Sequence, residues 1–231
     1  MLDRTLLVGD IHGDKKNISK LFEIAIFQNC DRIHCLGDFG YFPNLPECKE
    51  FLEITSKKSL ENGIAVSFTD GNHENHEYLN SLEIFENVFV APGIEWWYRG
   101  KMVGNILSIG GANSIDKTHR IRGRDWFPEE MISQKDFYKC SEKADFIFSH
   151  DCPYGIDFGF ELDEMTIKNQ KMLLEICEVV QPKILFHGHY HRFHRSVLEL
   201  NYGKLEVIGL GSGDCLEEQI VIFQNGVIEW I

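Results

Sequence analysis

Hydrophobic and polar positions follow two different periods over the first 70 residues of the chain. Three short apolar runs, each bounded by turn residues, have the composition of buried strands; they are residues 6–8, 32–36 and 64–68. Between them, apolar side chains recur at helical spacing over residues 18–26, where Asp14 can cap the helix, and residues 46–62 form a second helical stretch that Gly63 ends. This order of strands and helices predicts right-handed crossovers and a parallel sheet.

Shorter apolar runs replace this pattern from residue 88 onward. They predict strands at residues 88–91, 95–98, 102–109, 145–149, 183–186, 196–200, 205–210, 219–223 and 227–231. The segments Arg99-Gly100-Lys101 and Asn225-Gly226 are expected to form hairpin turns between neighbouring strands. Two more helices are expected, one from Ser133 to about residue 142 and one over residues 165–180, which Pro182 ends. The whole pattern predicts a mixed α/β fold with two sheets.

The composition is that of an ordinary globular chain of 231 residues, with 43% hydrophobic and 26% charged residues. We expect one domain over residues 1–231, because this length is enough for a sizeable core. The formal net charge of −13 argues against stable nucleic-acid binding. A phosphorylated substrate is still compatible with this acidity, because bound divalent cations would invert the local potential.

The cysteines indicate a reducing compartment. The sequence holds seven of them and no Cys-x-x-Cys pair; they are Cys30, Cys35, Cys48, Cys140, Cys152, Cys177 and Cys215. The first residues lack the basic and apolar regions of a signal peptide, and no apolar run approaches the roughly 20 residues of a membrane-spanning helix. We therefore expect a soluble, cytoplasmic protein without a membrane segment, and the sequence leaves its oligomeric state open.

Five of the predicted strands end in side chains that can bind metals. These side chains are Asp10 and His12, Asp38, Asn72, His150, and His189 with His191. Because ligands gather beyond the carboxyl ends of strands in open α/β sheets, these side chains can converge although they are far apart in sequence. Carboxylate, amide and imidazole groups without a thiolate suit manganese, iron, zinc or nickel better than a structural zinc site. Seven groups fit two cations that share one carboxylate.

The blocks that carry these side chains resemble the signature of the calcineurin-like metallophosphoesterases. They occur in the family's order and are Gly9-Asp10-Ile11-His12-Gly13, Leu36-Gly37-Asp38, Gly71-Asn72-His73-Glu74, Ser149-His150 and Gly188-His189-Tyr190-His191. The resemblance implies a four-layer α/β/β/α sandwich of two mixed sheets. It also implies two divalent cations, with Mn²⁺ as the first expectation and iron, zinc or nickel as alternatives.

The resemblance assigns roles to the matching positions. One cation would be held by Asp10, His12 and His191, the other by Asn72, His150 and His189, and Asp38 would bridge the two. The implied reaction is phosphoester hydrolysis by in-line attack of a metal-bridging hydroxide. His73 matches the family's catalytic histidine, and nearby carboxylates are expected to keep it protonated so that it can protonate the leaving oxygen. Many members have an Asp three residues beyond the bridging carboxylate, whereas this chain has Tyr41 there, which leaves the substrate class open.

Two segments are candidates for substrate contacts. Residues 110–126 form a long polar loop, and loops of that length are usually functional or disordered. In this loop Arg120 and Arg122 could bind a phosphate through bidentate contacts, or they could simply be solvated. Tyr41 could line a pocket for an aromatic group, or it could pack in the core.

Two interpretations of the activity stay open. The substrate is expected to be a phosphomonoester or a phosphodiester, in the form of a phosphorylated small molecule, a nucleotide or a phosphoprotein. The alternative is a catalytically silent scaffold of the same fold that binds a protein partner, and the presence of every ligand and of His73 argues against it. The other histidines are expected in surface, packing or supporting positions, with His76 on the surface of a helix and His187 buried or supporting a ligand.

Overall fold

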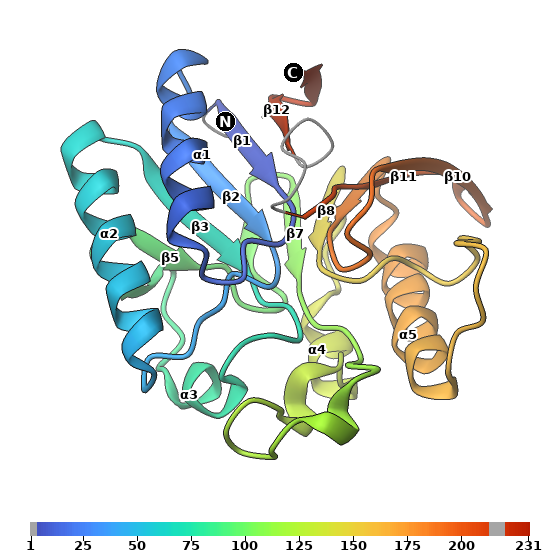
Figure 1. Cartoon of the computed structure of the whole chain (residues 1–231). Coiled ribbons are helices and arrows are strands. Elements are labelled where there is room, and N and C mark those ends of the chain that lie inside the picture. Colours follow the sequence, from blue (N-terminus) through green and yellow to red (C-terminus); the bar gives the residue numbers. More distant parts are fainter. Residues whose placement is uncertain (1–3, 213–219) are drawn as a thin grey trace.

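Two sheets lie face to face in the computed structural model, which describes residues 4–212 and 220–231 (Figure 1). The first sheet has the strand order β13 (Val227–Trp230), β12 (Ile220–Gln224), β1 (Thr5–Val8), β2 (Arg32–Leu36), β3 (Ala65–Thr69), β5 (Ile94–Trp96), β4 (Val88–Ala91). The second has the order β10 (His194–Leu200), β11 (Gly203–Gly209), β9 (Ile184–His187), β8 (Phe146–Ser149), β7 (Ile106–Ile109), β6 (Met102–Val103). Of the sequence-based expectations, those for Met1 to Asp3, Cys215 and Gln219 lie outside the described residues.

Helices cover both outer faces of this pair of sheets. The helices are α1 (Lys15–Phe27), α2 (Pro46–Asn62), α3 (His76–Ser81), α4 (Gln134–Lys139) and α5 (Glu164–Val180), with 3₁₀ turns η1 (Lys117–His119) and η2 (Pro128–Glu130). Helices α1 and α2 lie on the outer side of the first sheet, and α5 lies on the far side of the second (Figure 1). None of the helices in the described part of the chain is long and apolar enough to cross a membrane.

Three apolar cores separate the four layers. The side chains of β1 alternate between two of them, because Leu6 and Val8 face the core under α1 and α2 while Leu7 lies in the core between the sheets. Phe148 of β8 joins Leu7 in that middle core, and Leu173 of α5 lies in the third core, against the second sheet. The mixed α/β class and the four-layer α/β/β/α sandwich are therefore confirmed.

The helices begin and end where the sequence predicts, with one shorter than expected. The Asp14 side chain caps α1 by accepting hydrogen bonds from the backbone N–H groups of Lys16 and Asn17, at 2.7 and 3.0 Å. Gly63 ends α2 in the left-handed region, at φ +66°. Ser133 forms a capping box at the start of α4, which ends at Lys139 rather than near residue 142.

Two sequence-based expectations about the middle of the chain are wrong. Residues 102–109 form two short strands, β6 and β7, that pair antiparallel, and not one strand. The segment 99–101 does turn, with the N–H of Lys101 donating to the Tyr98 carbonyl at 2.9 Å, but it connects β5 of the first sheet to β6 of the second. It is therefore a connection between sheets and not a hairpin. A helix was expected at His76, but without bounds for it, because the six residues of α3 are too few for a clear period.

The parallel centres of the two sheets determine where the strand ends meet. In the first sheet β1, β2 and β3 run parallel, and in the second β7, β8 and β9 do. Each of these sheets therefore brings the carboxyl ends of its strands to one edge. The loops that leave these ends carry the candidate ligands.

Candidate metal centre

The predicted ligands from all five strand ends converge in one cluster. Three overlapping groups have ligand atoms within 4.8 Å of one another; they are Asp10, His12 and His191; Asp38, His150 and His189; and His12, Asp38 and His73. The first group holds the same residues as the first set expected from the sequence, and the second group holds His150 and His189 of the other set with the shared Asp38. The third was not expected, and it places the ring of His73 close enough to both sets to touch whatever they bind.

The first group joins the end of β1 to the loop after β9. The Nε2 atom of His191 lies 2.8 Å from Oδ2 of Asp10 and 3.3 Å from Nε2 of His12. The backbone N–H of His189 donates to Oδ1 of the same carboxylate at 2.9 Å. Asp10 is almost fully buried, whereas the two imidazoles are partly exposed, so the group opens toward solvent on the histidine side.

The second group is fully buried at its base. The Nε2 atom of His150 lies 3.0 Å from Oδ1 of Asn72 and 3.3 Å from Oδ1 of Asp38. The His150 and His189 rings are in edge contact, with centroids 4.9 Å apart. The other oxygen of Asp38, Oδ2, faces the first group, 3.8 Å from Nε2 of His12. The two oxygens of one carboxylate thus face two different ligand sets, and Asp38 lies between them.

Hydrogen bonds behind the cluster fix the orientation of its side chains. Nδ1 of His150 pairs with the Leu36 carbonyl at 2.8 Å, which directs Nε2 into the cluster. The Asn72 amide donates from Nδ2 to Oγ of Ser114 at 3.0 Å, so that its Oδ1 faces His150. Ser114 in turn donates from Oγ to the buried Glu130 carboxylate at 2.7 Å. Ser114 and Glu130 were not singled out from the sequence; Ser114 lies in the long loop, and no signal marks Glu130.

Helix α5 supports the two histidine loops from the other side. The Asp151 carboxylate, next to His150 in the chain, accepts hydrogen bonds from the Tyr190 hydroxyl and from Nδ2 of Asn169, both at 2.8 Å. Gln170 donates to the Tyr190 hydroxyl at 2.7 Å. Because Tyr190 stands between His189 and His191, this buried network ties both loops to α5.

The backbone of the cluster is held in an unusual conformation. Four candidate ligands lie in the left-handed region, with φ of +53° at His12, +49° at Asp38, +70° at His189 and +52° at His191. Each costs a non-glycine residue about 1–2 kcal/mol, and such strain concentrates at functional sites. Glycine is needed at position 37, because a Cβ there would lie 2.1 Å from Nδ1 of His150.

The electrostatics and the donor set both fit divalent cations. Burial alone would raise the pKa of the Asp38 carboxyl, but His150 and the other neighbouring histidines hold it well below its usual range. Burial lowers the pKa of His150, but the charge of Asp38 and its hydrogen bond raise it, and the net result is a pKa of about 10. The hydrogen bond to Asp10 likewise raises the pKa of His191. The buried carboxylates therefore favour positive charge beside them, and a divalent cation supplies it.

His73 lies beside the cluster, and its surroundings shift its pKa downward. Its backbone N–H donates to Oδ1 of Asp38 at 2.7 Å, and its ring Nε2 lies 4.0 Å from Oδ2 of the same carboxylate. Burial lowers the pKa of His73, and Asp38 only partly offsets this because Arg120 and His12 lower the pKa as well. The nearby carboxylates thus raise the pKa of His73 by less than its burial and its cationic neighbours lower it.

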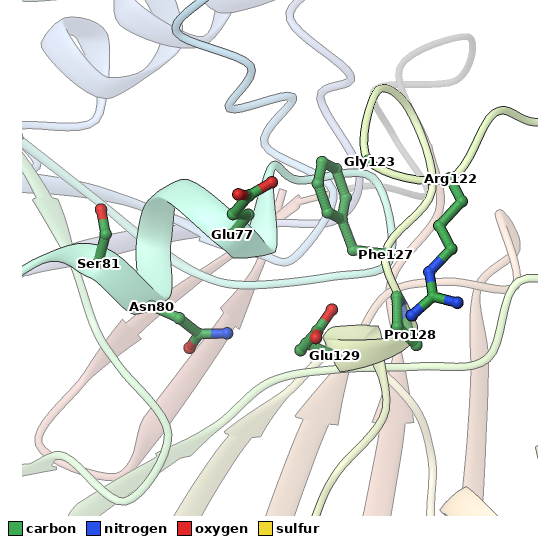
Figure 2. Close-up of a pocket in the computed structure, with 8 residues that line it drawn as sticks. All are labelled: Glu77, Asn80, Ser81, Arg122, Gly123, Phe127, Pro128 and Glu129. Atoms are coloured by element: carbon green, nitrogen blue, oxygen red, sulfur yellow. The ribbon is translucent and has the colours of Figure 1, made fainter.

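The long loop brings one of its two predicted arginines to the cluster. The Arg120 guanidinium contacts Nε2 of His73, and it donates to the Asn72 carbonyl at 3.4 Å. Asp116 holds the guanidinium in place through an ion pair of 2.7 Å. Arg122, two residues later, is exposed and lines a different pocket, between α3 and the segment around Pro128, where none of the predicted metal ligands lies (Figure 2).

Two other side chains lie elsewhere than the sequence suggested. Tyr41 is only 2% exposed and belongs to the core under α1 and α2, with its ring against Phe68 and Tyr78. It packs in the core, which was the second of the two possibilities for it, and does not line a pocket for an aromatic group. His76 is buried and not on a helix surface, because its Nε2 pairs with the Gly71 carbonyl at 3.0 Å.

The remaining histidines occupy packing or supporting positions, as expected. His34 is buried between the side chains of Ser67 and Thr69. His187 is buried at the end of β9, and its Nε2 lies 2.7 Å from Nε2 of His194. Neither belongs to the three ligand groups.

Comparisons with known proteins identify relatives of this architecture. A family model described as calcineurin-like phosphoesterase matches residues 3–193. The crystal structure of TT1561 of Thermus thermophilus is similar, with a TM-score of 0.56 at 13% identity over 99% of this chain and 98% of that chain. A structure of GAP50, described as the anchor in the inner membrane complex of Plasmodium, has a TM-score of 0.52 at 14% identity over 91% of this chain and 71% of that chain. At such identities the likeness shows the fold alone, and no curated protein matches the sequence significantly.

Proposed function

Because this chain belongs to the calcineurin-like phosphoesterase family, we propose that it is a metal-dependent enzyme that hydrolyses phosphoester bonds at the cluster around Asp38. The observation that carries the proposal is the position of the Asp38 carboxylate, whose two oxygens face two different ligand sets. Two neighbouring cations would share a buried carboxylate placed in this way. The substrate in this proposal is a phosphomonoester or a phosphodiester, carried by a small molecule, a nucleotide or a phosphoprotein.

Two divalent cations fit the proposed site. One would be held by Asp10, His12 and His191, the other by Asn72, His150 and His189, with Asp38 shared; Mn²⁺ is the first choice for this donor set, and iron, zinc and nickel are alternatives. Such cations supply Lewis acidity toward the phosphoryl oxygens and make a water nucleophilic near neutral pH.

The chain's own residues handle the proton and the phosphate charge. We assign proton donation to the leaving oxygen to the ring of His73, which reaches the edge of the cluster. A bound phosphate adds negative charge beside His73 and so favours its protonated form, against the effect of burial. Arg120, already held against His73 and Asn72, would bind the phosphoryl oxygens through charge-assisted hydrogen bonds. Arg122 stays a weaker candidate because it lines another pocket.

Two variants test this proposal with p-nitrophenyl phosphate and its bis ester as substrates, in the presence of Mn²⁺. Asp38→Ala should abolish turnover and lower the bound manganese, whereas His73→Ala should retain manganese and lose rate. Asp157→Ala, a change of an exposed carboxylate outside the cluster, is the control and should alter neither. Full activity of Asp38→Ala would refute the assignment, and a wild-type protein with neither turnover nor bound cations would instead favour the silent scaffold.

We also propose that the protein works in the cytoplasm. Six of its cysteines lie among the described residues, and all six are free and buried. Burial raises the pKa of thiols such as Cys177 and Cys35, which keeps them uncharged and unreactive. Free, buried cysteines without disulfides are typical of a protein in a reducing compartment.

A further inference from the structure

We propose that the leaving group of the substrate is uncharged or cationic, and that it binds in a small pocket between His73 and the start of α2. This inference rests on the proposed phosphoesterase function. The pocket has a volume of about 260 Å³, and its walls include His12, His73, Phe42, Leu45, Cys48 and Glu47.

The position of the pocket follows from the two histidines in its wall. His12 and His73 are in edge contact, with ring centroids 4.9 Å apart, and both belong to the ligand cluster. Because His12 and the ring of His73 belong both to the cluster and to the pocket wall, a group esterified to a phosphate at the cluster has this pocket beside it. The pocket against that ring is therefore where the leaving group is accommodated.

The walls away from the histidines are mostly apolar. Phe42 is partly buried and packs against the core under α1 and α2, so it forms a fixed wall. Cys48 is buried, and its sulfur accepts a hydrogen bond from the backbone N–H of Phe42 at 3.1 Å. Leu45 closes the side near the helix and is 39% exposed. The volume corresponds to about nine water molecules, which fits one small ring with a short substituent.

The charge at the rim selects against anionic groups. Of the described residues that line the pocket, none is a lysine or an arginine. Glu47 is its one carboxylate, and it is exposed in the first turn of α2. A second phosphate or a carboxylate at this rim would meet the like charge of Glu47, whereas an ammonium group would be attracted. The pocket therefore favours esters of neutral or amine-bearing alcohols.

A series of aryl phosphates tests this inference. The substrates are phenyl phosphate and its derivatives with a 4-aminomethyl or a 4-carboxy group, which differ mainly in the charge of the leaving group. Wild-type protein with Mn²⁺ should hydrolyse the amine with a kcat/KM about fivefold above that of the carboxylate, as expected for one partly exposed charge pair. Glu47→Lys should remove or reverse this preference.

A matched variant separates local charge from overall charge. Glu53→Lys makes the same change on the exposed side of α2, outside the pocket, and should keep the wild-type preference. Equal kcat/KM values for the three substrates in wild type, or equal effects of the two lysine variants, would overturn the pocket assignment and leave the phosphoesterase function standing. Failure of wild type to hydrolyse any of the three while it hydrolyses bis(p-nitrophenyl) phosphate would overturn the pocket assignment alone, and failure on all of these substrates would refute the function and this inference together.

Discussion

Ser114 offers the sharpest test of how the second ligand group is held. Its buried hydroxyl accepts from the Asn72 amide at 3.0 Å and donates to the Glu130 carboxylate at 2.7 Å. Ser114→Ala therefore leaves an amide N–H and a carboxylate oxygen without these partners, and each unsatisfied buried group costs about 1–3 kcal/mol. The Asn72 oxygen, which faces His150 at 3.0 Å, then loses its fixed orientation.

We expect Ser114→Ala to weaken one of two Mn²⁺ binding steps about 10–100-fold, the usual effect of losing a supporting hydrogen bond behind a metal ligand. That loss equals about 1.4–2.8 kcal/mol of binding free energy. The step assigned to Asp10, His12 and His191 should keep its affinity. Isothermal titration of chelator-treated protein with Mn²⁺ measures both steps.

A control variant must lose stability without approaching the cluster. Ser133→Ala serves this purpose, because it removes the capping box of α4 and should cost about 1 kcal/mol in the free energy of unfolding. Unchanged Mn²⁺ affinities in Ser114→Ala would refute the reasoning. Equal losses of affinity in both variants would refute it as well, because general destabilisation would then explain the effect.

Three other changes give measurable outcomes. Gly37→Ala places a Cβ 2.1 Å from Nδ1 of His150 and should abolish activity. Gly63 also has a positive φ, but open space surrounds it, so Gly63→Ala should retain activity and lower the free energy of unfolding in urea by only about 1–2 kcal/mol. Burial raises the pKa of the Asp136 carboxyl, but the ion pair with Arg99 outweighs burial, so that the pKa in the folded protein is lowered. The pair therefore stabilises the fold above about pH 4, and this stability is lost as the pH falls through the pKa of the folded state. Asp136→Asn should lower the urea midpoint at pH 7 and make the midpoint depend less on acid pH, and an unchanged dependence would contradict this. Arg120→Ala should lower kcat/KM for p-nitrophenyl phosphate about tenfold or more, and Arg120→Lys should recover part of it; equal activity of all three proteins would exclude a phosphate contact.

The sequence was sufficient where a regular period or a topological rule determined position. Asp10 and Asp38 follow two parallel strands of one sheet, which end at one edge, so their convergence could be predicted without coordinates; that His150 from the other sheet joins them was implied by the family resemblance. Helices α1 and α2 were predictable because one carries a clear apolar period and both have recognisable end signals.

Prediction failed where irregular backbone decides which way a side chain points. Tyr41 lies three residues beyond Asp38, but the chain turns at Gly40, with φ of +90°, and Tyr41 enters the core. Arg120 and Arg122 have the same chemistry two residues apart, and only the turns within the loop send one to His73 and the other to a separate pocket. Glu130 could not be found because its partner Ser114 is remote in sequence and no pattern links them.

The pairing of β1 also has a consequence for how the chain is made. This strand, which leads directly to Asp10, lies between β2 and β12, and Val8 pairs with Ile220. A ribosome releases β1 and β2 long before β12, so the other edge of β1 stays uncovered until β12 has emerged. His191 is likewise synthesised long after Asp10. A tight cation site therefore forms only after His191 has been made, and supplying metal cannot stabilise a nascent chain that stops before His191.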